Sequence, residues 1–250
     1  MKRRLVSLIL CLFALSALSG CAQKTQETAP SPVYGTKTVK FYEEPGSFFL
    51  SKAMDTAETA HALYCFDPLL SEEQQQTVLV KGEALLSALI TPVQGLTLCF
   101  YAPETYAYTY ISGHTLYTCL TEDFPAKILL TLTEGLGHYG TAYGLSALLL
   151  GEEASPAFPA ETALLDLNLL CFDSAFAAEE DIAALQSLAI DFARFYVDQF
   201  GQQALEALCF SAPAQEVSLA LSAYYASLGT AYTPPPCPLS LGERAMPTGF

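Results

Sequence analysis

Residues 96–120, LTLCFYAPETYAYTYISGHTLYTCL, decide the fold class of this chain. Apolar and polar side chains alternate over Leu96–Tyr101, which is the period-two pattern of a strand. The segment Tyr106–Leu120 is rich in Tyr, Thr and Ile and is interrupted by Ser112-Gly113, so it predicts a β-hairpin. We therefore expect a small sheet of three or more strands in the middle of the chain.

Helices are predicted before this sheet. Ser71, with Gln three residues later, has the spacing of a capping box, which opens a helix that runs to about Ile90 and is ended by Pro92. Apolar residues at helical spacing predict another helix over Ser47–Tyr64. Upstream, Thr38–Tyr42 reads as a first strand or a lead-in to the domain.

Helices are also predicted after the sheet. Pro125 suits the first position of a helix that runs to about Tyr139. The clearest helix is Asp181–Phe200, which Gly201 ends, and its predicted buried face consists of Leu188, Phe192, Phe195 and Phe200. Shorter helices are expected at Tyr143–Leu150, Glu161–Leu170, Gln202–Cys209 and Gln215–Leu228. The order of elements predicts the α+β class with a helical majority.

The N-terminus reads as a secretory signal peptide over residues 1–20. Three basic residues at positions 2–4 precede an apolar run from Leu5 to Leu18, which at about fourteen residues is too short to span a bilayer. The run continues into Ser-Gly-Cys21 and resembles the lipobox of bacterial lipoproteins. That resemblance implies acylation of Cys21 and a mature chain tethered to the extracytoplasmic face of the cell membrane. An ordinary signal peptide with an incidental cysteine is the alternative.

Composition sets the remaining boundaries. Residues 21–37 are polar and contain Pro, so they are expected to form a flexible stalk after the lipidated cysteine. Residues 38–230 are long enough for a single well-buried domain, and residues 231–250 read as a Pro-rich tail. The chain has 11 Lys and Arg against 26 Asp and Glu, a net charge of −15. Nucleic acid is excluded as a partner, because phosphate contact needs clusters of Lys and Arg.

Six cysteines remain after the signal peptide and the acylation site are set aside. Four of them, Cys65, Cys99, Cys171 and Cys209, each precede Phe in an apolar run. They read as small buried hydrophobes at least as well as cross-links, and both interpretations stay open. Because the sequence contains no C-x-x-C pair, it does not predict a zinc knuckle or a thioredoxin-type site.

Two stretches, residues 192–205 with the Phe200-Gly201 pair and residues 129–146 with Glu134 and His138, are similar to the zincin metallopeptidases of the gluzincin, peptidase MA-like type. Residues 192–205, FARFYVDQFGQQAL, resemble a helix–glycine–helix element late in those enzymes. Residues 129–146, LLTLTEGLGHYGTAYGLS, follow the predicted strands, where such enzymes place their metal-binding helix. The resemblance covers about residues 96–210 in the order of elements and implies a zincin-like domain.

The zincin site needs two histidines at i and i+4 on one helical face, with a Glu between them as the general base. If Glu134 is the base, Thr133 and Gly137 stand where the histidines belong, and His138 lies one residue too late. If Glu134 instead carries the third ligand, His114 lies near a motif's spacing upstream, but Tyr110 and Ile111 replace the first His and the base. The first register is preferred, because the segment that contains Glu134 reads as a helix.

We therefore expect a degenerate zincin in which Glu134 is a vestigial catalytic residue. His138 is the candidate metal ligand, and a zinc ion held by Glu134, His138 and Glu152 or Glu153 is imaginable. No cofactor is expected. The alternative interpretation of Glu134 and His138 is an exposed pair near a helix end.

Two weaker sequence patterns suggest ligand binding, but each also has a purely structural interpretation. The acidic residues Asp166, Asp173, Glu179, Glu180 and Asp181 suggest calcium, but they lack EF-hand spacing and are typical of a solvated helix start. A sugar-binding face and strand packing both fit the tyrosines Tyr101, Tyr106, Tyr108 and Tyr110.

The sequence thus predicts a lipid-anchored extracytoplasmic protein with a non-catalytic, peptidase-like domain that binds a peptide or protein partner. One alternative is an active zinc metallopeptidase with unusual ligands. Another is a structural lipoprotein of the cell envelope without zincin ancestry.

Overall fold

The structure is a computed structural model that describes residues 31–42, 49–133, 139–153 and 182–228. The chain divides into Met1–Ser31 and Pro32–Phe250, and all elements described below belong to the second part. The predicted signal peptide, Cys21 and the Pro-rich tail lie outside the described residues. Within the described part, no helix is long and apolar enough to cross a membrane.

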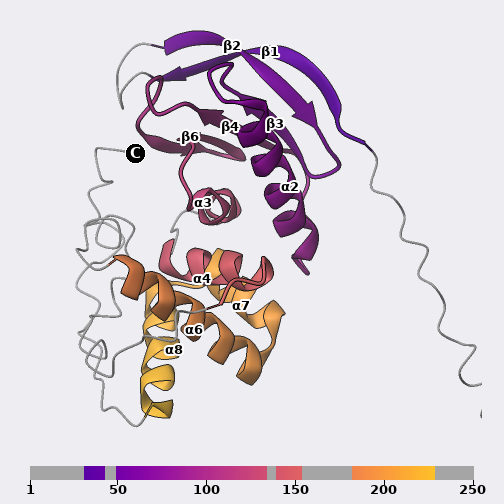
Figure 1. Cartoon of the computed structure of the whole chain (residues 1–250). Helices are drawn as coiled ribbons and strands as arrows, with labels where there is room; N and C mark the ends of the chain where they lie inside the picture. Colours follow the sequence, from indigo (N-terminus) through magenta and orange to yellow (C-terminus); the bar gives the residue numbers. More distant parts are fainter. Residues whose placement is uncertain (1–30, 43–48, 134–138, 154–181, 229–250) are drawn as a thin grey trace, which may run out of the picture. The chain divides into compact units, whose positions relative to one another are not determined.

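A mixed sheet forms one half of the fold, with strand order β1-β2-β3-β4-β6-β5 (Figure 1). Strands β3, β4 and β6 run parallel to one another, whereas β1, β2 and β5 run antiparallel to their neighbours. The strand bounds are β1 Val33–Tyr42, β2 Phe49–Glu58, β3 Ala62–Phe66, β4 Leu96–Tyr101, β5 Thr109–Ser112 and β6 Thr115–Cys119. The predicted strand at Leu96–Tyr101 and the hairpin around Gly113 are confirmed.

The predicted helix over Ser47–Tyr64 is wrong, because this segment contains β2 and most of β3. Its Ala and Met residues favour a helix locally. However, β2 pairs with β1 over ten residues, from Tyr42 opposite Phe49 to Val33 opposite Glu58. Tertiary pairing therefore overrides the local preference. The same pairing begins β1 at Val33, so residues 33–37 belong to the sheet and not to a flexible stalk.

Helices α2, Glu72–Ala88, and α3, Phe124–Leu130, pack on one face of the sheet. The predicted capping box of α2 is present, since Ser71 Oγ accepts from the Gln74 backbone and the Gln74 side chain accepts from the Ser71 backbone. The inner face of the sheet and the two helices share one apolar core, which includes Phe66, Leu85, Leu98, Phe100, Leu116, Phe124 and Ile128. Gly82 permits a close approach, because a Cβ there would lie 2.6 Å from the Tyr64 hydroxyl.

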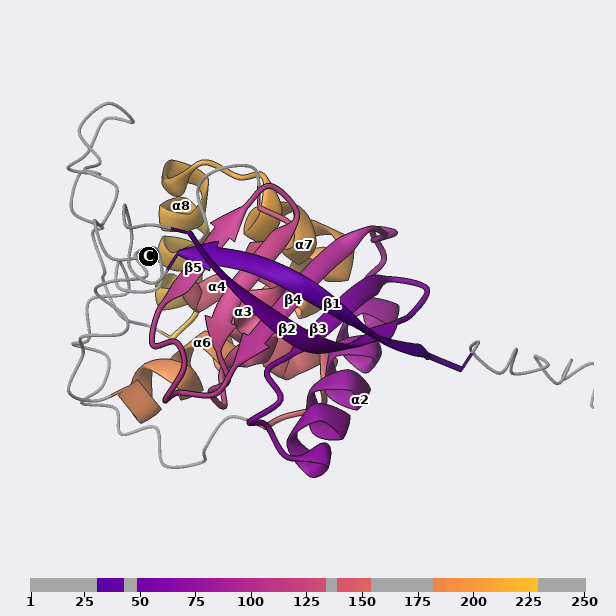
Figure 2. The ribbon, with the colours of Figure 1, turned by 90° about the horizontal axis from the view of Figure 1, so that it is seen from above.

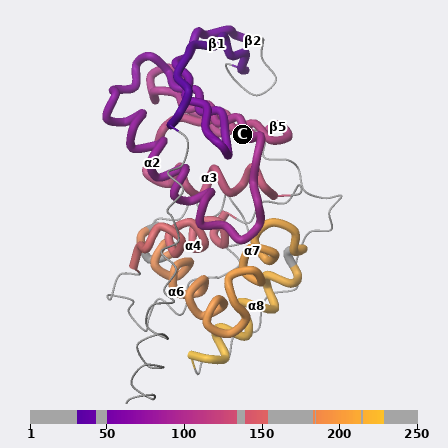
Figure 3. Tube along the Cα trace, turned by 90° about the vertical axis from the view of Figure 1, so that its right-hand side faces the viewer, coloured from indigo at the N-terminus to yellow at the C-terminus, as the bar shows by residue number. Residues whose placement is uncertain are grey.

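The second half of the fold is helical (Figure 3). Its buried residues belong to the same core as those between the sheet and its helices. It contains α4 Tyr139–Leu149, α6 Ile182–Phe200, α7 Gln202–Phe210 and α8 Ala214–Ser227. Gly201 separates α6 from α7 with a φ of 85°, which suits glycine. Gly144 of α4 lies against the backbone of α6, because a Cβ there would stand 2.2 Å from the Ala189 carbonyl oxygen.

The helix over residues 181–200 is confirmed, but its predicted face is only partly right. Leu188 and Phe192 are buried, Phe195 is half-buried, and Phe200 is 58% exposed. The buried face of α6 instead includes Leu185, Ala189 and Ala193. It is therefore rotated around the helix axis from the predicted face, toward the small residues that face α4. The sequence pattern overweighted aromatic residues, because small alanines also pack where two helices approach closely.

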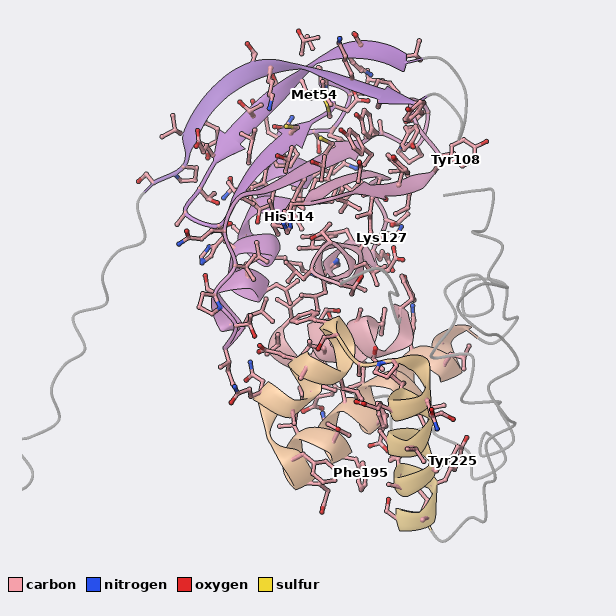
Figure 4. All side chains as sticks on the ribbon, turned by 180° about the vertical axis from the view of Figure 1, so that it is seen from behind. Met54, Tyr108, His114, Lys127, Phe195 and Tyr225 are labelled. Carbon is pink, nitrogen blue, oxygen red and sulfur yellow. The ribbon has the colours of Figure 1, made fainter. Side chains whose placement is uncertain are left out.

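The outer face of the sheet carries a separate apolar cluster, which we call the outer cluster. Strands β1 and β2 cross over the strands beside them and cover this face (Figure 2). Met54 lies within this layer (Figure 4). The buried members of the outer cluster are Val39, Phe41, Met54, Cys65, Cys99, Tyr101 and Tyr106.

Candidate functional site

The predicted catalytic residue Glu134 and the predicted metal ligand His138 lie outside the described residues. The structure nevertheless corrects the single helix predicted from Pro125 to Tyr139. Helix α3 ends at Leu130, and α4 begins only at Tyr139. Thr133, the position of the first zinc ligand in the preferred register, therefore lies beyond the end of α3.

Hydroxyl groups explain why α3 stops early. Thr131 Oγ1 donates to the Ile128 carbonyl at 2.6 Å, and Thr133 Oγ1 donates to the Leu130 carbonyl at 2.8 Å. The backbone N–H of Thr131 also bonds to the Ile128 carbonyl, three residues back. These contacts tighten the last turn and satisfy carbonyls that a longer helix would use.

The other candidate ligands are dispersed. His114 is exposed in the turn between β5 and β6, and Glu152 and Glu153 are exposed after α4. Tyr110 and Ile111 lie in the strand β5, whereas the second register needs these two positions on a helix, so the structure counts against that register. Within the described part of the chain, no group of three His, Cys, Asp or Glu side chains is arranged to hold a metal ion.

On its outer side, the edge strand β5 presents backbone groups that pair with no other strand in the described part of the chain. Its hairpin turn places Gly113, with a φ of 56°, directly after Ser112, as in a two-residue turn of type II′. The N–H of Cys119 donates to the Tyr108 carbonyl at 3.3 Å, which shows that residue 108 faces β6. Because facing alternates along an antiparallel strand, Thr109 and Ile111 direct their N–H and C=O groups away from β6. Among the described residues, β5 pairs only with β6.

Aromatic side chains surround this edge. The Tyr110 ring lies 5.9 Å from the ring of Tyr42 and 5.9 Å from the ring of Tyr117, measured between centroids. Tyr108, Tyr110 and Tyr117 are half-buried, and burial raises the pKa of Tyr117. Rings that are partly exposed and already fixed by neighbours lose little entropy when they bind a ligand.

Tyr101 and Tyr106 serve packing, because both are buried in the outer cluster. Burial raises the pKa of Tyr106 to about 12 and that of Tyr101 further. The Tyr101 hydroxyl is the one buried side-chain N or O atom of the described residues that has no hydrogen-bond partner. Of the four tyrosines that suggested a sugar-binding face, only Tyr108 and Tyr110 therefore remain accessible.

The opposite edge of the sheet is different in character. Strand β1 is ten residues long and carries Lys37 and Lys40 as exposed side chains. Lysines on an edge strand discourage the addition of another strand, because their charge would have to be desolvated. Strand β5 has the sequence Thr-Tyr-Ile-Ser and carries no charge. Of the two edges, β5 is therefore the one suited to accept an extended peptide.

Two polar clusters in the sheet region hold the fold together. At the start of β3, Glu83 of α2 accepts hydrogen bonds from Thr59 Oγ1 at 2.8 Å and Tyr64 Oη at 3.0 Å. Its other oxygen lies 2.8 Å from His61 Nδ1. Burial, followed by the charge of Glu83, raises the pKa of Tyr64. These partners are 19 to 24 residues from Glu83, so the sequence gives no local signal for this cluster.

The second cluster lies at the other end of β3. The buried carboxylate of Asp67 accepts from Lys52 Nζ at 2.8 Å and from the Leu69 N–H at 3.0 Å. Lys52 also donates to Thr105 Oγ1 at 3.0 Å. Burial would raise the pKa of Asp67, but the hydrogen bonds and charge of Lys52 outweigh it and lower that pKa. All of these polar groups are paired, so they read as fixed structure and not as open reactive groups.

A third polar cluster stands at the start of α3. Asp123 accepts hydrogen bonds from the hydroxyls of Thr121 and Tyr139, and its carboxylate lies 3.2 Å from Lys127 Nζ. Burial opposes ionisation of Asp123, but Lys127 and the two hydroxyls lower its pKa. The nearby Tyr143 has its pKa raised to about 12 by burial and by Glu152. This cluster joins α3 to α4 across the segment that contains Glu134.

Comparison with known proteins identifies no family. No protein-family model matches the chain, and no curated protein matches it. Among solved structures, an M1 zinc metallopeptidase from Deinococcus radiodurans is similar at 10% identity with a TM-score of 0.30, covering 74% of this chain. A point mutant of that enzyme matches at 11% identity with a TM-score of 0.30, covering 73% of this chain. The alignment spans 63% and 62% of the two enzyme chains. Likeness at this level carries no argument about activity.

Proposed function

We propose that this protein is a lipid-anchored extracytoplasmic lipoprotein whose domain binds an extended peptide segment of a partner without cleaving it. The observation that carries the proposal is the uncharged edge of β5, with its outward backbone groups at Thr109 and Ile111. A peptide strand added there would pair with these groups, and the tyrosines beside the edge would contact its side chains. The anchor part of the proposal rests on the sequence around Cys21.

The absence of cleavage is proposed from residue types. The preferred register places Thr133 and Gly137 where a zincin has its histidines, and neither side chain replaces imidazole. Helix α3, over Phe124–Leu130, contains no His, Asp or Glu. We propose a degenerate zincin origin from the resemblance of residues 129–146 and 192–205 to those enzymes. An active metallopeptidase with unusual ligands and a purely structural envelope lipoprotein remain the alternatives that experiment must separate.

The net charge of the chain restricts which peptide segments can bind. With a net charge of −15, the protein repels acidic segments over the range of the Debye length. A partner segment that is neutral or basic, with alternating apolar side chains, fits the edge of β5 best. Strand addition supplies affinity through the backbone, and pockets for alternate side chains supply specificity.

The binding proposal is tested with a random dodecapeptide display library selected on the purified domain. The decisive variant is Ile111→Pro, which removes an N–H that points away from β6 and so leaves the bonds to β6 in place. Its matched control is Ile111→Ala, which removes the same side chain but keeps that N–H. We expect selected peptides to bind the wild-type domain and Ile111→Ala similarly, and Ile111→Pro at least about tenfold more weakly, equivalent to about 1.4 kcal/mol.

Each alternative has its own result in this experiment. Selected peptides that bind Ile111→Pro as well as Ile111→Ala would contradict binding at this edge. Peptides that are recovered cleaved, together with about one zinc per chain and loss of cleavage in Glu134→Gln, would establish the metallopeptidase instead. A library that yields no binder above the empty support would favour the structural role.

The anchor is tested separately by replacing Cys21 with Ala and fractionating the cells. We expect the wild-type protein in the membrane fraction and the Cys21→Ala protein outside it, because the variant has no thiol to acylate. A Cys21→Ala protein that still partitions with membranes would show that the anchor assignment is wrong.

A further inference from the structure

Two cysteines from distant parts of the sequence meet on adjacent strands. Cys65 of β3 and Cys99 of β4 are direct partners in the parallel register. Both are buried, and both belong to the outer cluster, so their side chains leave the sheet on the same face. The neighbouring pairs in this register, Tyr64 with Leu98 and Phe66 with Phe100, belong to the helix-covered core on the other face.

The two thiols are also in contact. The Cys99 side chain hydrogen-bonds to Cys65, and this bond, together with the charge of Lys37, outweighs burial and lowers the pKa of Cys65. The same hydrogen bond and burial raise the pKa of Cys99. This hydrogen bond belongs to the folded protein, where it marks the two side chains as neighbours.

The register suits a disulfide. Neighbouring strands lie about 4.7–4.9 Å apart, and disulfides join residues whose Cα atoms are about 4.4–6.8 Å apart. By contrast, Cys119 of β6 is paired with Tyr101, and Cys209 lies in α7 within the helix-covered core. Of the cysteines in the described ranges, only Cys65 and Cys99 are placed as register partners.

We propose that Cys65 and Cys99 are joined by an intrachain disulfide in the mature protein. The oxidant is a disulfide of a thiol–disulfide exchange partner. The Cys65 thiolate attacks it to give a mixed disulfide and one released thiol, and Cys99 then displaces the second thiol. The two cysteines lose two protons and two electrons in total, and the oxidant's disulfide is reduced to two thiols.

The disulfide rests on the proposed function in one respect, because it persists only in an oxidising compartment such as the extracytoplasmic space. A chain that is exported before it folds meets the oxidant while both thiols are still exposed. Folding then buries the bond in the outer cluster and protects it from reductants. The bond would fix β3 to β4 across a loop that contains α2, and so would constrain the unfolded chain.

The test uses full-length protein recovered from the membrane fraction, quenched with acid and alkylated with N-ethylmaleimide without reduction. Digestion with trypsin and a glutamate-specific protease separates Cys99 from Cys119 at Glu104, and mass spectrometry then detects linked peptides. We expect a Cys65–Cys99 linked peptide in the wild-type protein and in Cys209→Ala, and an alkylated Cys65 in Cys99→Ala. A second arm refolds the reduced, purified protein with oxidised glutathione and looks for the same linked peptide.

The two arms separate this inference from the proposed localisation. Membrane-fraction protein in which Cys65 and Cys99 are both alkylated would overturn the disulfide while leaving the anchor intact. The protein could instead be found in the cytosolic fraction with both thiols alkylated, and still give the linked peptide after refolding. That combination would overturn the localisation and support the pairing of these thiols. Failure to form the linked peptide on refolding would overturn the disulfide.

Discussion

Strands β1 and β5 are both edges of one sheet, but they present different chemistry. Strand β1 runs for ten residues and carries two exposed lysines, and its apolar residues Val39 and Phe41 turn inward to the outer cluster. Strand β5 runs for four residues, carries no charge and lies among half-buried tyrosines. The lysines protect β1 against strand addition, whereas we propose that the uncharged β5 accepts an added strand.

The largest loss of stability is expected from a substitution of Phe41, which holds β1 against the outer face of the sheet. The Phe41 ring lies 4.8 Å from the Tyr101 ring and 5.6 Å from the Tyr106 ring, and Phe41 is buried. Phe41→Ala should lower the free energy of unfolding by about 3–5 kcal/mol, measured by urea denaturation. The neighbouring exposed residue gives the control, since Lys40→Ala should change it by less than about 0.5 kcal/mol. Equal losses would show that β1 is not attached through Phe41.

The next largest loss of stability is expected when the ion pair between Lys52 of β2 and Asp67, at the end of β3, is broken. Lys52→Met leaves the buried Asp67 carboxylate without its cation and should lower the free energy of unfolding at pH 7 by about 3 kcal/mol. Because the pKa of Asp67 is lowered in the folded protein, this stability is present above the unfolded pKa of about 3.9 and is lost as pH falls through the folded pKa. The difference between wild type and Lys52→Met should therefore shrink in acid, and a constant difference would refute this origin.

A lysine transferred to the open edge should make β5 resemble β1. Ser112 is exposed at the end of β5, so Ser112→Lys adds a charge without removing a buried side chain. We expect peptides selected on the wild-type domain to bind this variant about tenfold more weakly, or about 1.4 kcal/mol. Ser112→Gln, which is also longer than Ser but uncharged, serves as the control and should bind nearly as well as wild type. Equal weakening in both variants would assign the effect to size.

The smallest effect has the opposite sign. Tyr101→Phe removes a buried hydroxyl that has no partner among the described residues. Leaving such a group unsatisfied costs about 1–3 kcal/mol, so its removal should raise the free energy of unfolding by about 1 kcal/mol. Thermal and urea unfolding measure this directly. A clear loss of stability would mean that the hydroxyl does have a partner in the folded protein.

Local patterns predicted the elements whose signals are local. The capping box at Ser71, the alternation over Leu96–Tyr101 and the turn at Gly113 each fix the structure of their own segment. The pattern over Ser47–Tyr64 failed, because β2 owes its conformation to pairing with β1 along its whole length. The end of α3 was missed for another reason, since apolar spacing continued while the hydroxyls of Thr131 and Thr133 closed the helix.

The candidate site was less accessible from sequence than the fold. The resemblance to zincins predicted a site at Glu134 and His138, whereas the proposed peptide-binding edge is β5, in the hairpin that precedes them. The two-residue turn at Gly113 fixes which residues of β5 bond to β6, so it implies that the N–H and C=O groups of Thr109 and Ile111 point away from β6. Whether another strand lies on that side depends on the strand order of the sheet, which the turn does not specify. The pairing of Cys65 with Cys99 depends on strand order, which no local pattern encodes.

Residue-resolved amide hydrogen exchange of the domain with a selected peptide tests the central claim most directly. In the free protein the N–H groups of Thr109 and Ile111 face away from β6, so they should exchange quickly. In the complex they should be protected by at least about tenfold, because hydrogen bonds to the added strand must open before exchange occurs. The outward amides of β1 should not change. Protection along β1, or binding that leaves Thr109 and Ile111 unprotected, would contradict the account.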